Sequence, residues 1–113
     1  MAEGLAFRAI ADPTRREILD LLRDRGPMRA GDIAARFGEM TRIAVSKHLR
    51  VLREARLVRI TESEDARERL YALDNEGLRE VSAWLQGYEV FWQGRLAELK
   101  RLAEEDNEPN QQP

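Results

Sequence analysis

The side chains best suited to bind a ligand lie in residues 41–56, TRIAVSKHLRVLREAR. At 100° per residue, Val45, Leu49 and Leu52 fall on one side of a helix, and basic residues fall on the other. A helix of this diameter fits the major groove of DNA, where basic side chains bind phosphates and base edges. The ordinary alternative is a solvated helix face. The outer face comprises Arg42, Ile43, Ser46, Lys47, Arg50, Arg53 and Glu54.

The preceding residues predict a second short helix and a tight turn. Residues 28–37 place apolar side chains at helical spacing, and Gly38 follows where a helix-ending glycine belongs. After this short turn, Thr41 is a good N-cap for the next helix. Two short helices joined in this way are typical of a helix-turn-helix, in which the second helix, residues 41–55, reads DNA.

Further elements are expected on both sides of this pair of helices. Leu5–Ile10 is a short helical stretch, and Asp12, as the N-cap before a proline, begins a helix that Gly26 ends. After the reader helix, the β-rich residues 57–61 and 67–73 enclose a polar run. They predict a β-hairpin with a loop of several residues, the wing of a winged helix.

A long C-terminal helix is expected after Asp74, which can cap it. Its large apolar residues recur every three or four positions and exceed what one small core needs, so we expect this helix to form a dimer. The fold class is therefore mainly α with a small β-hairpin: a winged helix-turn-helix with a long C-terminal dimerisation helix. We expect one domain at residues 3–104 and a disordered acidic and polar tail at residues 105–113.

The composition limits the possible functions. The chain has no cysteine and one histidine, which excludes disulfides, thiolate metal sites and cysteine nucleophiles. It has no glycine-rich phosphate loop and no pair of carboxylates on a plausible cleft face, so we expect no enzyme and no cofactor. Without a long apolar run or a signal peptide, a cytoplasmic protein that avoids membranes is expected.

The net charge of −2 hides an uneven distribution. Residues 1–60 hold 13 Lys and Arg against 8 Asp and Glu, whereas residues 61–113 hold 6 against 13. The first half could therefore lie on phosphate groups while the second half faces solvent or a partner.

The order of elements and three segments together resemble the ArsR/SmtB family of bacterial transcriptional repressors. The segments are Ala9–Arg16 (AIADPTRR), Ala44–Leu52 (AVSKHLRVL) and Arg69–Leu73 (RLYAL), and the resemblance covers about residues 5–103. It implies a homodimeric winged helix that binds an imperfect inverted repeat in operator DNA. It also implies an effector that releases the DNA, but the sequence does not identify one.

The expected DNA contacts lie on the reader helix and the wing. Arg42, Ser46 and Ile43 would touch base edges, whereas the other basic residues of the helix would hold phosphates. We expect the lone histidine to pack or to lie near a phosphate, because one histidine makes no zinc site. The full set is Thr41, Arg42, Ile43, Ser46, Lys47, His48, Arg50, Arg53, Arg67 and Arg69.

The expected dimer contacts combine the first and last helices. The family resemblance also implies contacts from the first helix. The set is Leu5, Phe7, Ile10, Leu78, Val81, Leu85, Tyr88, Trp92, Leu96 and Leu99.

The chain departs from the family in its metal ligands and in two features near DNA. The family's Cys-Val-Cys-Asp-Leu pattern is replaced by residues 29–33, RAGDI, and the last helix has no histidine, so we expect no metal site. Arg56 stands where the family usually has a glycine, at a position that often needs a positive φ. The wing tip carries Glu62, Glu64 and Asp65 where basic residues are common.

Two alternatives remain open at this stage. The winged helix could bind a protein instead of DNA, which the acidic wing slightly favours and the basic outer face argues against. A regulator that responds to a small molecule could use an apolar pocket, although an aromatic stripe is more often a dimer core. The pocket residues would be Trp84, Tyr88, Phe91 and Trp92.

Overall fold

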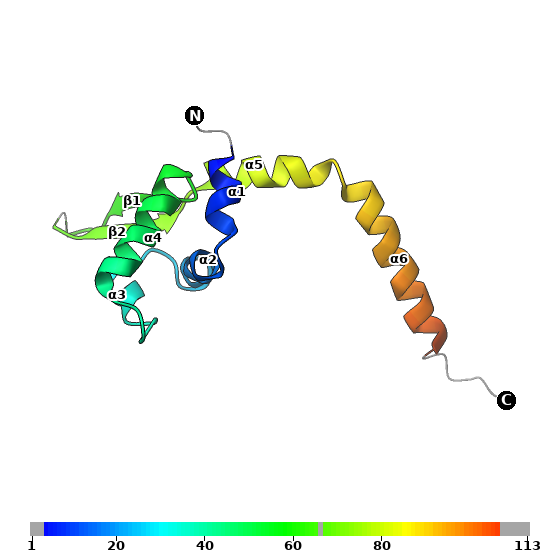
Figure 1. The fold of residues 1–113 in the computed structure, drawn as a ribbon, viewed down its shortest axis with the longest axis horizontal. Helices are drawn as coiled ribbons and strands as arrows, with labels where there is room; N and C mark the ends of the chain where they lie inside the picture. The colour runs from blue at the N-terminus through cyan, green and yellow to red at the C-terminus, as the bar shows by residue number, and fades with distance from the viewer. Residues whose placement is uncertain (1–3, 66, 107–113) are drawn as a thin grey trace. The chain divides into compact units, whose positions relative to one another are not determined.

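The computed structural model describes residues 4–65 and 67–106. Its contacts divide the chain into two units, residues 1–81 and 82–113, each of which is described by itself. It has the predicted class: a mainly helical winged helix with a two-stranded hairpin and a long C-terminal helix (Figure 1). The elements are α1 (Leu5–Ile10), α2 (Pro13–Arg25), α3 (Ala30–Ala34), α4 (Arg42–Glu54), β1 (Val58–Glu62), β2 (Arg69–Leu73), α5 (Asn75–Gln86) and α6 (Glu89–Asp106).

Helix α2 begins and ends as predicted. Pro13 occupies its first position, and the carboxylate of Asp12 accepts a hydrogen bond from the backbone N–H of Arg15 at 3.0 Å. Gly26 follows the helix with a φ of 80°, which a residue with a side chain rarely adopts. This hydrogen bond is the main reason that the pKa of Asp12 lies below its ordinary value, because it favours the ionised carboxylate.

Two arginines of α2 hold the carboxyl end of α1. Arg15 donates from Nε to the carbonyl of Ala9 at 2.7 Å and from Nη2 to that of Arg8 at 3.1 Å. Arg16 donates from Nη1 to the carbonyl of Ile10 at 2.7 Å. The last carbonyls of a helix lack partners within it, so these bonds satisfy them. The Asp-Pro-Thr-Arg-Arg sequence thus fixes the corner between the two helices, a role that the sequence analysis did not assign.

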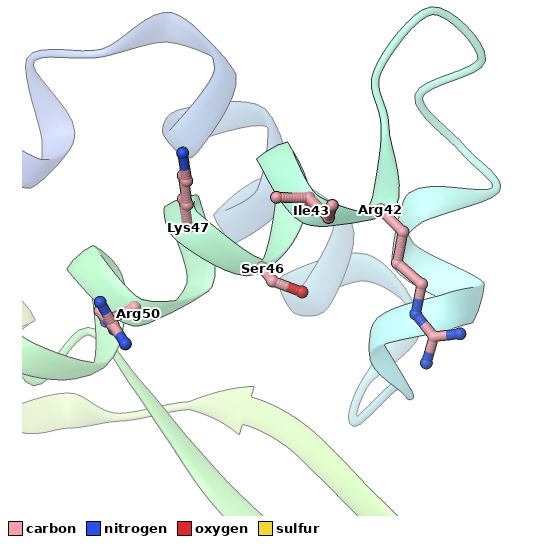
Figure 2. Close-up of a pocket in the computed structure, with 5 residues that line it drawn as sticks. All are labelled: Arg42, Ile43, Ser46, Lys47 and Arg50. Carbon is pink, nitrogen blue, oxygen red and sulfur yellow. The ribbon is translucent and has the colours of Figure 1, made fainter.

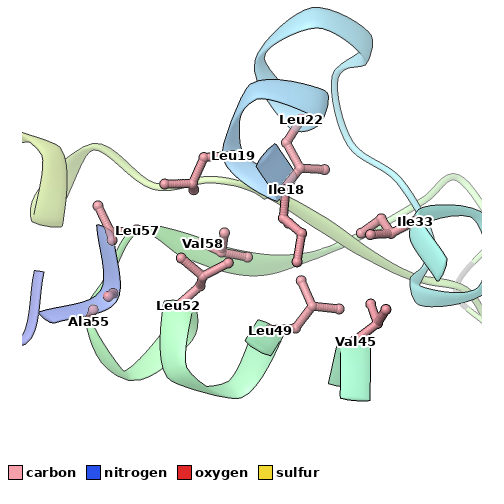
Figure 3. Close-up of a cluster of buried hydrophobic side chains, with 11 residues drawn as sticks. Ile18, Leu19, Leu22, Ile33, Val45, Leu49, Leu52, Ala55, Leu57 and Val58 are labelled. Atoms are coloured by element: carbon pink, nitrogen blue, oxygen red, sulfur yellow. The ribbon is translucent and has the colours of Figure 1, made fainter. Parts of the chain in front are cut away.

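The core of residues 4–81 lies where α2, α3, β1 and the inner face of α4 meet (Figure 3). Helix α2 contributes Ile18, Leu19 and Leu22, which are buried, and Leu21 is half-buried at the edge of the core. Burying an aliphatic side chain of this size contributes about 1.5–3 kcal/mol. The largest fully buried side chains are Ile18, Ile33, Leu49, Leu52, Leu57, Val45 and Val58.

The helix before the turn is shorter than the sequence predicts. Helix α3 ends at Ala34 and not at Phe37, because the following backbone bonds, including Phe37 N–H to the carbonyl of Ala34 at 3.0 Å, span three residues. Gly38 has no positive φ, so its predicted role as the helix-ending glycine is wrong. The segment between α3 and α4 is consequently longer than the predicted three residues.

Helix α4 ends in a left-handed turn at Arg56, which has a φ of 57°. The N–H of Leu57 bonds to the carbonyl of Leu52 at 2.9 Å, and that of Arg56 bonds to Arg53 at 3.0 Å. These two bonds define a Schellman motif, whose left-handed residue is usually glycine. The sequence-based expectation that this position needs a positive φ is confirmed, and arginine adopts it despite a cost of roughly 1–2 kcal/mol.

Helix α5 begins in close contact with this turn. The N–H of Gly77 donates to the carbonyl of Arg56 at 2.7 Å. A Cβ on Gly77 would lie 2.5 Å from the carbonyl oxygen of Ala55 and 2.9 Å from that of Arg56. Only glycine permits this approach, which joins the start of α5 to the end of the reader helix.

The wing is a regular antiparallel hairpin, as predicted. Its register runs from Val58 paired with Leu73 to Glu62 paired with Arg69, and a loop of several residues joins the strands. Tyr71 of β2 also exchanges two backbone bonds with Met28, at 3.0 and 2.7 Å, which tie the hairpin to the segment before α3.

The C-terminal segment forms two helices where the sequence predicts one. Helix α5 ends at Gln86 and α6 begins at Glu89, with backbone bonds from Gly87 to Trp84 and from Tyr88 to Leu85 across the break. Glycine costs about 1 kcal/mol in a helix interior, which explains a break at this position. Glu105 and Asp106 of the expected tail are the last residues of α6, and residues 107–113 lie outside the described residues.

Replacing Arg56 with glycine should stabilise the protein by about 0.5–1 kcal/mol, because glycine adopts the left-handed conformation without steric cost. Urea unfolding at one protein concentration measures the change. Arg50→Gly in the middle of α4 is the matched control and should destabilise by about 1 kcal/mol. Destabilisation by both variants would contradict the assignment of strain to Arg56.

Replacing Asp12 with alanine should cost about 1 kcal/mol at pH 7, the usual contribution of an N-cap. Because the folded pKa of Asp12 is lowered, its stabilisation is present above the ordinary value of 3.8 and is lost as the pH falls through the folded pKa. The difference in unfolding free energy between Asp12→Ala and the parent should therefore shrink from pH 7 to pH 3. A difference that is the same at both pH values would show that the charge of the cap contributes nothing.

Candidate nucleic-acid interface

Helix α4 is fixed at its start and along its inner face. The hydroxyl of Thr41 accepts a hydrogen bond from the backbone N–H of Ala44 at 3.0 Å, so Thr41 is the predicted N-cap. Val45, Leu49 and Leu52 are buried, which leaves the opposite face of the helix pointing outward.

Every residue of the predicted outer face is exposed. Its hydrophobic member, Ile43, is 71% exposed, which is unusual for a residue that normally packs in a core. Figure 2 shows a shallow groove lined by five of these side chains. The five residues are Arg42, Ile43, Ser46, Lys47 and Arg50.

Arg42 reaches sideways toward α3, away from the other four (Figure 2). Its guanidinium carbon lies 4.0 Å from the position that a Cβ would take on Gly31. A second groove, lined also by Ser46, Arg67 and Arg69, runs from this point to the loop end of the wing. The structure thus brings the two predicted wing arginines together with the start of the reader helix.

An ion pair joins the loop end of the wing to the start of α3. Arg29 donates to Glu68 at 2.7 Å and to Asp32 at 3.3 Å; the side chains of Arg29 and Asp32 are exposed, and that of Glu68 is half-buried. Such a surface pair contributes about 0–1 kcal/mol, so its role is to orient the loop more than to stabilise it. This contact could not be predicted from neighbouring residues, because only the fold brings residues 29 and 68 together.

One acidic residue of the wing tip, Asp65, forms hydrogen bonds within the loop. The carboxylate of Asp65 accepts a hydrogen bond from the backbone N–H of Arg67 at 3.2 Å. The backbone carbonyl of Asp65 accepts another from the hydroxyl of Ser63 at 2.6 Å. At least one acidic residue of the tip therefore shapes the turn that presents the arginines.

His48 lies apart from the outer face. It is half-buried, and its Nδ1 is 3.4 Å from Nη1 of Arg15. With Nδ1 unprotonated, the ring accepts a hydrogen bond from this guanidinium. The structure therefore places His48 between the reader helix and the arginine that holds α1, and not with the other predicted DNA contacts.

The residues predicted for dimerisation differ in exposure. Leu5 and Ile10 pack partly against the core of their own chain, and Phe7 is half-buried. In residues 82–106, by contrast, large apolar side chains are at least 44% exposed, including Val90, Phe91 and Leu102, which the prediction did not include. The exposed members of the predicted set are Leu78, Leu85, Tyr88, Trp92, Leu96 and Leu99.

Within residues 4–65 and 67–106, no three His, Asp or Glu side chains are grouped so that they could hold a metal ion. In the same part of the chain, none of the helices has the length and apolar character needed to cross a membrane.

Comparison with known proteins identifies the class. A family model described as a helix-turn-helix domain matches residues 10–61. The transcriptional repressor SdpR of Bacillus subtilis is 38% identical over 82 residues, which make up 73% of this chain and 87% of that protein.

Solved structures agree with this similarity. The crystal structure of an ArsR family transcriptional regulator matches with a TM-score of 0.67 and 32% identity, covering 81% of this chain and 91% of that one. The solution structure of a homodimeric winged helix-turn-helix DNA-binding domain, Mb0332 of Mycobacterium bovis, matches with a TM-score of 0.59 and 25% identity, covering 78% of each chain.

The chain therefore belongs to the ArsR family of helix-turn-helix transcriptional regulators, a class of DNA-binding proteins and not of enzymes. The family resemblance seen in the sequence is confirmed.

Replacing Arg42 with alanine should weaken binding to the preferred DNA sequence by about 1–3 kcal/mol and reduce preference at one base position. Lys47→Ala is the comparison variant and should weaken binding to all sequences about equally, because a phosphate contact carries no sequence information. Selection from random duplexes measures the preference. An unchanged base preference in Arg42→Ala would show that this residue does not read a base.

Proposed function

We propose that this protein is a dimeric repressor that reads an inverted-repeat operator with helix α4. The observation that carries the proposal is the exposed basic face of α4, which shares Arg42 and Ser46 with the groove leading to the wing. A protein partner would not require such a face, whereas DNA phosphates do. The similarity to SdpR, which is named as a transcriptional repressor, supports repression and not activation.

The proposed roles follow the position of each side chain. Arg42, Ser46 and Ile43, at the start of α4, touch base edges, the last by apolar contact with a thymine methyl group. Arg67 and Arg69 bind phosphates from the loop end of the wing. We assign His48 to positioning the helix, because it contacts Arg15. The remaining phosphate contacts are Thr41, Lys47, Arg50 and Arg53.

The proposed dimer uses the predicted apolar stripe of α5 and α6, which comprises Leu78, Val81, Leu85, Tyr88, Trp92, Leu96 and Leu99. A soluble monomer rarely exposes so many large apolar residues on consecutive helices, and such surfaces mark interfaces. The homodimer described for Mb0332 supports the same assembly. A two-fold axis would place the two reader helices about 34 Å apart, one turn of DNA, so the operator would be an inverted repeat.

We also propose that the protein is not a metal sensor and acts in the cytoplasm, where its DNA is. The absence of cysteine and the presence of one histidine, which already contacts Arg15, support the first point. An effector, if the protein has one, would then be of another chemical class.

Replacing Trp92 with glutamate should convert the dimer to a monomer, because it places a charge in the apolar stripe of α6. Light scattering measures the mass, and operator affinity should fall far more than affinity for nonspecific DNA. Val90→Glu is the matched control, since residue 90 lies about 160° from Trp92 around the helix and is 90% exposed. A wild-type protein that is monomeric when it protects a symmetric operator would refute the dimer.

A further inference from the structure

A third groove lies beside the C-terminal end of the reader helix. It encloses about 470 Å³ between α4 and β1 and has four arginines in its lining. Two of them, Arg50 and Arg53, are among the predicted DNA contacts, whereas Arg56 and Arg59 are not. Apolar contact comes from Val58 and Ile60 of β1, and the acidic members are Glu54 and Asp74.

The four arginines of this groove, Arg50, Arg53, Arg56 and Arg59, form none of the ion pairs found among the described residues. The carboxylate of Asp74 accepts a hydrogen bond from the backbone N–H of Glu76 at 3.0 Å and pairs with none of these arginines. The lining holds four arginines against two acidic residues, Glu54 and Asp74, so the groove keeps a net positive charge among the described residues that form it.

The backbone at Arg56 is a second, independent observation. Arginine holds a left-handed conformation there that glycine would adopt without steric cost. A strained residue that persists at such a position suggests that its side chain serves a function. The side chain of Arg56 contributes to the lining of the groove.

The groove is continuous with the face that meets DNA. Arg50 lines both this groove and the one on the outer face of α4, which in turn shares Arg42 and Ser46 with the wing groove. A helix of 13 residues is about 20 Å long, whereas the major groove is about 12 Å wide. If α4 crosses the groove with its start at the bases, its end reaches the sugar-phosphate backbone at the edge of the groove.

We propose that the groove of Arg50, Arg53, Arg56 and Arg59 binds phosphodiester groups of the DNA backbone beyond the bases that α4 reads. This inference rests on the proposed function and extends it, since it adds Arg56 and Arg59 to the interface. The groove increases affinity and lengthens the protected DNA without changing the preferred sequence, because phosphate contacts carry no base information.

The test uses the full chain and an operator selected from random duplexes, with affinity measured from 50 to 200 mM salt. Each phosphate contact contributes about 0.9 to the slope of log affinity against log salt. Arg56→Gly combined with Arg59→Gln removes two contacts from each protomer, so the slope of the dimer should fall by about 3–4. The selected base preference should stay the same.

Three comparisons make the result specific. Arg25→Gln with Arg79→Gln removes equal charge from exposed positions outside these grooves and should leave the slope within about one unit of wild type. Arg56→Lys with Arg59→Lys retains the charge and should retain the slope. Inorganic phosphate, titrated without DNA into the wild type and the double variant, tests the other source of the same chemistry. Saturable binding of inorganic phosphate by the wild type alone, together with equal salt slopes for operator binding by the two proteins, would assign the groove to free phosphate and overturn the proposal.

The outcome also separates this inference from the function on which it rests. A wild-type protein without preference for any duplex would refute the proposed function. A wild-type protein that binds its operator, together with a double variant whose salt slope matches the Arg25 and Arg79 control, would refute the groove alone. Thermal unfolding of the double variant should show no loss of stability, because glycine relieves the strained position.

Discussion

The packing of the inner face of α4 is the constraint on which the rest of the structure depends. Val45, Leu49 and Leu52 are held by side chains from α2, α3 and β1, so rotating the helix would expose them to water. The three residues bury enough apolar surface for several kilocalories per mole. The core therefore sets the direction of the basic face. The basic side chains point to solvent because of this packing and do not depend on further contacts within the chain.

Much of this arrangement can be predicted from the sequence because it depends on local periodicity and capping. The two faces of α4, the N-caps Asp12 and Thr41, and the hairpin were all readable from neighbouring residues. The positive φ at Arg56 was expected from the family resemblance and is confirmed.

The features that could not be predicted depend on competition between alternative backbone hydrogen bonds or on contacts between residues far apart in the chain. After Ala34, hydrogen bonds across three residues replace α-helical ones. In the C-terminal segment, Gly87 and Tyr88 interrupt the helix although the apolar pattern of the sequence continues. The ion pair of Arg29 with Glu68 and the placement of Arg50 and Arg59 along one groove exist only after folding. Periodicity within one segment cannot report such neighbours.

The corner between α1 and α2 restricts what position 15 can hold. One planar guanidinium serves the carbonyls of Arg8 and Ala9 and also approaches the ring of His48 on the reader helix. A lysine would keep the charge but offers a single ammonium group, which cannot span three acceptors in different directions. Position 15 should therefore tolerate fewer replacements than other accessible cations of this chain, and a change there would loosen α1 and α4 at the same time.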